Sequence, residues 1–362
     1  MRAVKIASRL VGEGYPCLIV AEGGVNHNGE SELAKRLVDA AQEAGADAIK
    51  FQTFKTERII TWDAPKAEYQ KQTTDPDESQ FEMLRRLELS REAHQELVDY
   101  CQQKKILFMS SPFDEESADF LDELGVVVFK IPSGEITNLP FLAHLARKGK
   151  PMIVSTGMSH LSEVETAIDT IKREGNDKII LLHCVSSYPT APRDVNLRAI
   201  ETMAKTFGLP VGFSDHTPGI EVALAAVALG ACVIEKHLTL DRSLPGPDQR
   251  TSLEPDEMST LVRGVRIVES SLGHGRKEPA ASEANIASAA RKSLVAAQDI
   301  LAGTVLTEAM IAVKRPGTGL VPGMKSNLIG RTAKKSIPAG TLFTLEMIEM
   351  PPTEKDGSHL MF

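Results

Sequence analysis

The chain has 362 residues, of which 42% are hydrophobic and 25% are charged. These fractions are typical of folded globular proteins and exclude long disorder and fibrous repeats. The length suggests about two domains, although one α/β barrel can take roughly 250 residues by itself. The apolar runs are too short for a transmembrane helix and no signal-peptide pattern begins the chain, so we expect a cytoplasmic protein without membrane contact.

The charge balance argues against a nucleic-acid surface. There are 41 Lys and Arg residues against 49 Asp and Glu residues, and the formal net charge is −8. No long basic tract is present, so an anionic ligand must be held by a local cluster of positive charge. The four cysteines, Cys17, Cys101, Cys184 and Cys232, are widely spaced and predict reduced thiols, not a disulfide framework or a zinc site.

Short apolar runs typical of β-strands recur through the first two thirds of the chain. They lie at 18–20, 48–51, 106–109, 126–131, 152–154, 179–182, 211–213 and 232–234. Amphipathic segments separate most of them, such as 33–41, which Gly45 follows as a residue suited to a helix C-cap. Apolar strands alternating with helices predict a parallel sheet covered on both faces. Eight such units predict a (β/α)8 TIM barrel, an α/β fold.

Two segments depart from the regular barrel pattern, one within the barrel and one after its last helix. Residues 53–89, between the second and third predicted strands, are too long for one crossover and predict an insertion, a lid or a hairpin. From Arg291 onward, short runs punctuated by Gly and Pro predict a small β-rich domain, which is marginally stable alone and packs on its own barrel or on a partner subunit. The predicted divisions are a TIM-barrel catalytic domain over 1–275, a linker over 276–289, the small domain over 290–352 and a tail over 353–362.

Polar side chains follow each apolar run. They include Glu22, Lys50, Gln52, Ser111, Lys130, Ser133, Glu135, Ser155, His183, Tyr188, Ser214, His216, Glu235, Lys236 and His237. The carboxyl ends of barrel strands converge on one mouth, where barrel enzymes place their chemistry. The ligand site is therefore predicted at this end.

Two histidines suggest a metal. His216 and His237 come just after neighbouring predicted strands, so their imidazoles can meet. Two neutral imidazoles suit Mn²⁺, Zn²⁺ or Fe²⁺, with Glu22 as a nearby carboxylate. The alternative is a pair of hydrogen-bonded barrel histidines without metal.

Positive charge and hydroxyls predict an anionic small substrate. Lys50, Lys130 and Arg315, with Ser111, Ser133, Ser155 and Ser214, would give the point charges and short donors that phosphate and carboxylate need. Each lysine taken alone is better explained as a rim or surface residue, but two predicted strands that both end in an apolar residue followed by lysine favour the pocket. Glu22 and Glu135 follow separate strands and would transfer protons or orient a lysine.

Seven ordered segments of this chain resemble the sialic acid synthases. They are 21–29, 50–52, 130–135, 155–158, 214–217, 235–237 and 245–248, and the segments 290–294 and 313–317 resemble the antifreeze-like (SAF) domain that ends these enzymes. The resemblance implies condensation of phosphoenolpyruvate with N-acetylmannosamine and water to a nine-carbon 2-keto acid and phosphate, the reaction of an N-acetylneuraminate synthase. It also implies a divalent metal, Mn²⁺ or Mg²⁺, on His216 and His237 as a Lewis acid.

The resemblance assigns further roles residue by residue. Glu22 and Glu135 join the histidines as catalytic candidates. Positions that hold the phosphate and carboxylate of phosphoenolpyruvate correspond to Lys50, Ser111, Lys130, Ser133, Ser155, Ser186 and Ser214, and sugar-side positions to Gln52, Tyr188, Asp248 and Arg315. It implies a domain-swapped homodimer in which Arg315 acts on the sugar of the other subunit.

Several alternatives stay open. The segments 185–187 and 249–250 depart from the common pattern of the family, which is as compatible with a legionaminic acid or spore-coat-type synthase using a 2,4-diacetamido-6-deoxy-hexose. A rival enzyme class is another barrel aldolase, either a 3-deoxy-heptulosonate-type synthase or a pyruvate aldolase with a Schiff base on Lys130. A second class is a sugar-phosphate binding module without catalysis.

Overall fold

The computed structural model describes residues 3–75 and 77–349. The chain divides into two compact units, Met1–Gly273 and His274–Phe362, which are described separately. No helix within the described residues is long and apolar enough to span a membrane. The predicted tail, 353–362, and the last three residues of the predicted small domain lie outside the described residues.

The first unit is a barrel of parallel strands. They are β3 (Leu18–Gly24), β4 (Ala48–Thr53), β5 (Leu107–Pro112), β6 (Phe129–Ile131), β7 (Met152–Ser155), β8 (Ile179–Cys184), β9 (Val211–Asp215) and β10 (Val233–His237). Their hydrogen-bonded order is β5-β4-β3-β10-β9-β8-β7-β6, and β5 also contacts β6. The prediction of a TIM barrel is therefore confirmed. β6 is shorter than predicted because residues 126–128 precede it without joining the sheet, although Val126 and Val128 are buried.

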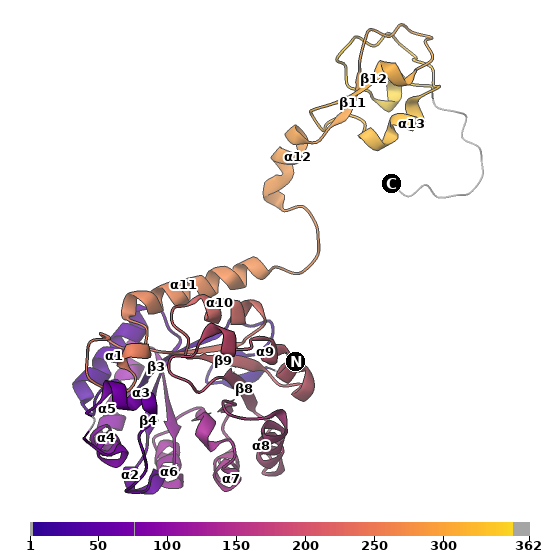
Figure 1. The fold of residues 1–362 in the computed structure, drawn as a ribbon. Helices are drawn as coiled ribbons and strands as arrows, with labels where there is room; N and C mark the ends of the chain where they lie inside the picture. Colours follow the sequence, from indigo (N-terminus) through magenta and orange to yellow (C-terminus); the bar gives the residue numbers. More distant parts are fainter. Residues whose placement is uncertain (1–2, 76, 350–362) are drawn as a thin grey trace. The chain divides into compact units, whose positions relative to one another are not determined.

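Helices cover the outside of these strands (Figure 1). They are α1 (Ser31–Glu43), α5 (Arg91–Lys104), α6 (Glu115–Glu123), α7 (Leu139–Arg147), α8 (Leu161–Arg173), α9 (Arg198–Phe207), α10 (Glu221–Ala228) and α11 (Pro255–Leu272). The predicted helix stop at Gly45 is confirmed, because this residue follows α1 at φ +82°, where glycine has no steric penalty.

Side chains alternate between the two faces of each strand, and this alternation positions the site. On β3, Ile19 and Ala21 pack outward among the helices, whereas Leu18 and Val20 pack inside the barrel. The next inward position on β3 is Glu22, at the carboxyl end.

An antiparallel hairpin closes the other end of the barrel. Its strands are β1 (Val4–Ile6) and β2 (Arg9–Val11), with Val4 paired to Val11. Val4, Ile6 and Val11 are buried in the same apolar cluster as the interior residues of the barrel. The interior therefore opens at the carboxyl ends of the strands and is covered by the hairpin at the amino ends.

The predicted insertion between β4 and β5 is helical. It contains α2 (Thr56–Ile59), α3 (Glu68–Thr73) and α4 (Gln80–Arg86), with no hairpin among its described residues. Phe54, Met83 and Leu87 form a small core there with Val25 of the β3–α1 loop. Trp62 stacks on Phe81 with ring centroids 4.0 Å apart. The insertion is thus a packed wall anchored beside the barrel mouth.

The second unit has its own core. Helix α12 (Ala284–Ala290) precedes an antiparallel pair, β11 (Ser293–Ala296) and β12 (Ile311–Lys314), and α13 (Lys325–Leu328) follows. Isolated antiparallel bridges, such as Ile300 with Ile337, connect the remaining loops. Leu294, Leu306 and Phe343 are among its fully buried residues, so a small β-rich unit is confirmed.

Candidate active site

A cavity of about 480 Å³ lies at the carboxyl ends of the barrel strands. Every barrel residue predicted for the site except Glu135 lines it, namely Glu22, Lys50, Gln52, Ser111, Lys130, Ser133, Ser155, Ser186, Tyr188, Ser214, His216, His237 and Asp248. We call this cavity the catalytic pocket. Most of these positions continue the inward rows of the strands, which explains why residues far apart in the sequence meet here.

Strand β10 shows how alternation separates two groups of charges. Glu235 and His237 face the catalytic pocket. Lys236, between them, faces outward and donates from Nζ to Asp215 Oδ2 at 2.7 Å, with 1% of its side chain exposed. Lys236 therefore belongs to a structural ion pair and not to the site.

Two lysines and two carboxylates form the charged floor of the pocket. Lys50 pairs with Glu22 and also donates to Ser111 Oγ at 3.2 Å. Lys130 donates to Glu235 Oε1 at 3.1 Å, and Ser214 Oγ donates to the same oxygen at 3.0 Å. Because all four charged side chains are buried, a bound anion would meet these lysines in a poorly solvated environment where charge counts strongly.

The two carboxylates differ in their protonation. Burial raises the pKa of Glu22 to about 7, against the opposing pull of Lys50. Burial also tends to raise the pKa of Glu235, but Lys130 and Lys50 outweigh it and lower that pKa to about 2. The pocket therefore holds one carboxyl group able to exchange a proton near neutral pH and one that stays ionised.

The hydroxyls of Ser133 and Ser155 are available as donors to an anion. Ser133 Oγ accepts from the backbone N–H of Gly157 at 3.0 Å, which directs its own proton elsewhere. Ser155 Oγ is buried and has no hydrogen-bond partner in the described part of the chain. A Cβ on Gly157 would lie 2.3 Å from Ser186 Oγ, so only glycine allows this close approach.

The two histidines lie together, as predicted. The ring centroids of His216 and His237 are 5.5 Å apart, and the Tyr188 ring lies 4.1 Å from that of His216. His216 Nδ1 is 2.8 Å from the carbonyl oxygen of Val185, which fixes the ring and leaves Nε2 as a ligand.

The histidine pair suits a metal because one ring nitrogen, Nδ1 of His237, has no hydrogen-bond partner within the described ranges of the chain. His237 Nδ1 is buried without a hydrogen bond, and burial lowers the pKa of His237 well below its ordinary value, so the ring is neutral. Asp248 Oδ2 lies 3.9 Å from this nitrogen. Among the described residues no group of three or more His, Cys, Asp or Glu side chains forms a complete metal site, so water or substrate would have to complete the shell.

The outer wall of the pocket comes in part from the insertion. Met83 and Leu84 of α4 present apolar surface there, together with Val25 of the β3–α1 loop and Phe113 after β5, next to the amides of two glutamines. Gln80 Nε2 donates to Gln70 Oε1 at 3.3 Å. Sequence reasoning missed this wall because a helical insertion gives no signal of which face meets the barrel mouth.

One predicted barrel residue lies outside the described lining of the pocket, and Arg315 belongs to the second unit. Glu135 lies outside the lining and its Oε2 accepts from Asn138 at 2.8 Å, so the structure gives it a loop-stabilising contact instead of the predicted proton-transfer position. Arg315 lies on the second unit, where its Nε donates to the carbonyl oxygen of Ala290 at 3.1 Å. Glu235, which the sequence places at the end of the last strand but to which it assigns no role, also lines the pocket. Its position two residues before His237, on the same face of β10, is the signal that identifies it.

The fold and the site define a barrel enzyme with a pocket for a small anionic substrate. Residues 37–277 match the NeuB family and residues 291–349 match the SAF domain. The chain therefore belongs to the NeuB family, and the predicted resemblance is confirmed. It is an enzyme of the phosphoenolpyruvate-dependent sugar-acid synthase type.

Individual relatives cover nearly the whole chain. The N,N'-diacetyllegionaminic acid synthase of Legionella pneumophila is 49% identical over 93% of this chain and 96% of its own. The enzyme of the same name from Campylobacter jejuni is 47% identical over 88% of this chain and 96% of its own. The crystal structure of an N-acetylneuraminic acid synthetase from Leptospira borgpetersenii, in complex with citrate, is 38% identical with a TM-score of 0.70, over 79% of this chain and 95% of its own.

Proposed function

We propose that this enzyme condenses phosphoenolpyruvate with a 2,4-diacetamido-6-deoxy-hexose to give N,N'-diacetyllegionaminic acid or a near isomer. The observation that carries the reaction type is the buried floor of Lys50 and Lys130 beside the hydroxyls of Ser111 and Ser214. Such a floor suits the phosphate and carboxylate of phosphoenolpyruvate.

The bond changes follow from this placement. The C3 carbon of phosphoenolpyruvate attacks the aldehyde carbon of the open-chain sugar, forming the new C–C bond, and the aldehyde oxygen gains a proton. Water adds to C2 and gives its proton to a base. The C–O bond between C2 and the phosphate of the tetrahedral intermediate then breaks, phosphate leaves with the electron pair and takes the proton of the C2 hydroxyl, and the C2 carbonyl of the 2-keto acid forms.

The chain supplies the base and the charge control for these steps. Glu22, with its pKa raised to about 7 by burial, accepts the proton of the attacking water. Glu235 stays ionised and holds Lys130 in place until the substrate binds. The positive charge that develops at C2 is stabilised by these carboxylates.

His216 and His237 would hold a divalent ion, Mn²⁺ or Mg²⁺, which supplies Lewis-acid polarisation of the sugar aldehyde when bound. His216 is oriented by the carbonyl of Val185, and His237 presents a buried nitrogen with no protein partner. Tyr188 packs against both imidazoles, with its ring centroid 4.1 Å from that of His216 and 5.9 Å from that of His237.

The choice of sugar differs from the first expectation of N-acetylmannosamine. The relatives at 49% and 47% identity are named diacetyllegionaminic acid synthases, whereas relatives named for N-acetylneuraminic acid or its 9-phosphate are 38% to 41% identical. The apolar wall of Met83, Leu84 and Phe113 supports the same choice, because a 6-deoxy sugar with two acetamido groups presents three methyl groups.

The Schiff-base alternative has a specific difficulty. A Schiff base requires a neutral lysine amine, and Lys130 instead pairs through its ammonium with the buried carboxylate of Glu235. Borohydride treatment in the presence of pyruvate is expected to leave the protein mass unchanged. A covalent adduct on Lys130 would establish the aldolase chemistry and end the present proposal.

The deciding experiment measures phosphate release from phosphoenolpyruvate with Mn²⁺ present. The acceptors are 2,4-diacetamido-6-deoxy-mannose, N-acetylmannosamine and N-acetylmannosamine 6-phosphate. We expect the highest kcat/KM with the diacetamido sugar. A preference for N-acetylmannosamine would restore the sialic acid reaction, and no release with any of them would leave a binding protein without this activity.

The oligomeric state and location stay predictions of the sequence. We propose a domain-swapped homodimer in which the second unit of one chain, with Arg315, completes the sugar side of the other. The same proposal places the enzyme in the cytoplasm, where phosphoenolpyruvate is available. The domain boundaries proposed above are 1–275 and 290–352; most of α12 (Ala284–Ala290) falls in the segment between them.

A further inference from the structure

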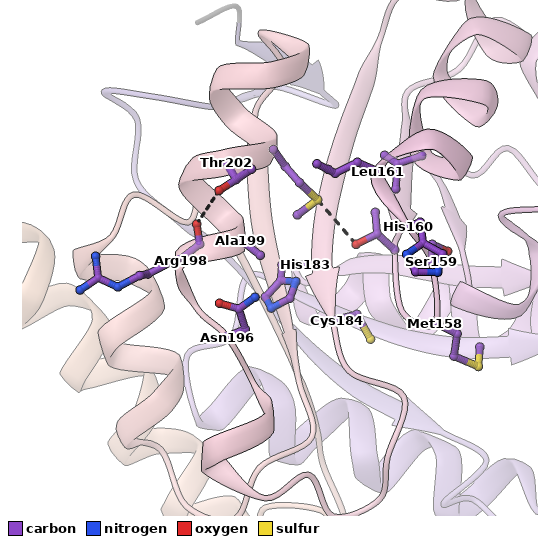
Figure 2. A pocket seen from close by; sticks show the side chains of 13 residues that line it. Met158, Ser159, His160, Leu161, His183, Cys184, Asn196, Arg198, Ala199 and Thr202 are labelled. Carbon is purple, nitrogen blue, oxygen red and sulfur yellow. Dashed lines mark hydrogen bonds between the residues drawn. The ribbon is translucent and has the colours of Figure 1, made fainter.

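A second cavity, of about 440 Å³, lies beside the catalytic pocket and outside the barrel ring. It is formed at the starts of α8 and α9, against the outward side of β8 (Figure 2). Only Met158 and Cys184 line both cavities. We call it the outer pocket. Its size is in the usual range for small-molecule sites, roughly 300–1,000 Å³.

The outer pocket has a buried floor with one open acceptor. His183 is 9% exposed and lies centrally in the lining, between Asn196 and Cys184 in Figure 2. Its Nε2 is 2.6 Å from the carbonyl oxygen of Val195 and must therefore donate, so in the neutral ring Nδ1 is an acceptor. No hydrogen-bond partner for Nδ1 is found among the described residues, and this nitrogen is not sealed from the cavity.

The hydroxyls of the lining are acceptors as well. Thr156 donates its proton to the carbonyl of Leu182, and Ser159 donates to the carbonyl of Gly157. Thr202 donates to the carbonyl of Arg198, as the dashed line in Figure 2 shows. Each oxygen then offers only lone pairs to a ligand. A ligand with several O–H or N–H donors would satisfy these acceptors, while Asn196 and Arg198 of the same lining can donate to its oxygens.

Apolar side chains complete the lining. Val164 and Met203 are buried, whereas Met158 and Leu161 are 72% and 44% exposed at the rim. Met158 has a left-handed backbone, φ +63°, which is costly for a residue with a Cβ and is commonly retained at ligand sites. The ligand must therefore carry small apolar groups as well as donors.

The charge of the lining limits the ligand further. Arg198 and His160 lie at the starts of the two helices, and no described lining residue carries a carboxylate. An acid group on the ligand is thus tolerated at the rim. Donors, methyl groups and an optional carboxylate occur together in acylated amino sugars and their sugar acids.

We propose that the outer pocket is a second binding site, for an acylated amino sugar, separate from the site of reaction. The chemistry has two sources in this enzyme, the acceptor sugar and the sugar acid that it forms, and the choice of these probes rests on the proposed function. The site has a physical connection to catalysis, because Val195 ends the loop that carries Ser186 and Tyr188 over the catalytic pocket.

The test counts bound molecules per chain. Isothermal titration of the full-length enzyme with Mn²⁺ is carried out separately with the acceptor sugar, with the purified sugar acid and with inorganic phosphate. Ala199→Trp fills the outer pocket from α9, and Thr206→Trp places the same side chain on an exposed position two turns further along this helix. We expect two molecules of one of the sugars on the wild type and on Thr206→Trp, and one molecule on Ala199→Trp.

A milder variant guards against misfolding of the filled pocket. Thr202 is exposed, and Thr202→Val removes one acceptor oxygen without adding bulk. It should weaken the second binding event roughly 2- to 12-fold and leave the first unchanged. Equal second-site affinity in Thr202→Val and the wild type would contradict the assigned contact.

The outcomes separate the two proposals. If phosphate release is normal but the wild type binds one sugar molecule, or Ala199→Trp still binds two, the outer pocket is not a ligand site. If the second site takes inorganic phosphate and neither sugar, the ligand class is wrong. If no acetamido sugar supports phosphate release, the proposed function fails, while a second sugar molecule sensitive to Ala199→Trp would still support the outer pocket.

Discussion

The substitution Gly157→Ala tests the anion-binding role of the serines most directly. A Cβ at this position would lie 2.3 Å from Ser186 Oγ and 2.7 Å from Ser133 Oγ. Both hydroxyls would have to move by roughly 1 Å to reach ordinary contact distance. We expect the protein to fold and its activity at limiting phosphoenolpyruvate to fall.

The expected loss can be worked out from the crowding. Overpacking of this kind costs about 1–3 kcal/mol. If the cost falls on the bound state, kcat/KM for phosphoenolpyruvate drops about 5- to 150-fold, since about 1.4 kcal/mol is a factor of ten. The KM for the sugar should change less, because Met83 and Leu84 of the apolar wall, which we propose to contact the sugar, lie on the insertion.

Steady-state kinetics with each substrate varied in turn measures this effect. The matched control is Gly134→Ala, on a neighbouring loop of the same pocket, where an added Cβ meets nothing within 4 Å. This control should behave like the wild type within about twofold. Wild-type kcat/KM in Gly157→Ala would refute the assignment of Ser133 and Ser186 to the anion.

Four further outcomes are expected. His237→Ala should abolish turnover and lower bound Mn²⁺ measured by elemental analysis, with an unchanged circular dichroism spectrum; full activity of chelator-treated wild type would contradict the metal role. Lys236→Met should lower the free energy of unfolding in urea by about 3–5 kcal/mol, because it leaves Asp215 buried and charged, and adding Asp215→Asn should recover part of the loss. The pKa of Glu22 is raised from 4.5 to about 7, so between these pH values the folded state binds more protons than the unfolded state. The free energy of unfolding of metal-free wild type, relative to that of Glu22→Gln, should therefore fall as pH rises through this range. A difference between the two free energies that does not change with pH would refute the raised pKa. Arg315→Ala should impair use of the sugar more than of phosphoenolpyruvate, and mixing it with His237→Ala should restore partial activity if Arg315 acts across the dimer.

The barrel and most of the site could be predicted from the sequence for one physical reason. Parallel strands buried on both faces are continuously apolar, and their register brings the residues that follow them to one rim. Lys50, Lys130 and His237 therefore converge although many residues separate them. The eight runs were short but regular, and all of them correspond to strands.

What could not be predicted depends on side-chain direction and on loops. Glu135 follows β6 as the other candidates follow their strands, but it lies on a short helical turn where its carboxylate reaches Asn138. Whether a polar residue in a loop faces the mouth or the solvent is set by local turn geometry, which periodicity does not encode. The apolar wall from α4 is unpredictable for the same reason.

The strand alternation also explains a difference between adjacent charges. Glu235 and Lys236 are neighbours in sequence, yet one meets Lys130 inside the barrel and the other meets Asp215 outside it. Sequence proximity would have grouped them in one network. Their separation follows from the two-residue period of a strand.

The hairpin of β1 and β2 limits how molecules can reach the catalytic pocket. Val4, Ile6 and Val11 cover the amino-terminal end of the barrel interior. Reactants and products must therefore enter and leave at the carboxyl end of the strands. Under the proposed binding mode phosphoenolpyruvate lies on the lysines of the pocket floor, so we expect it to bind before the larger sugar. We likewise expect inorganic phosphate, formed on the pocket floor beneath the sugar acid, to leave the enzyme after it.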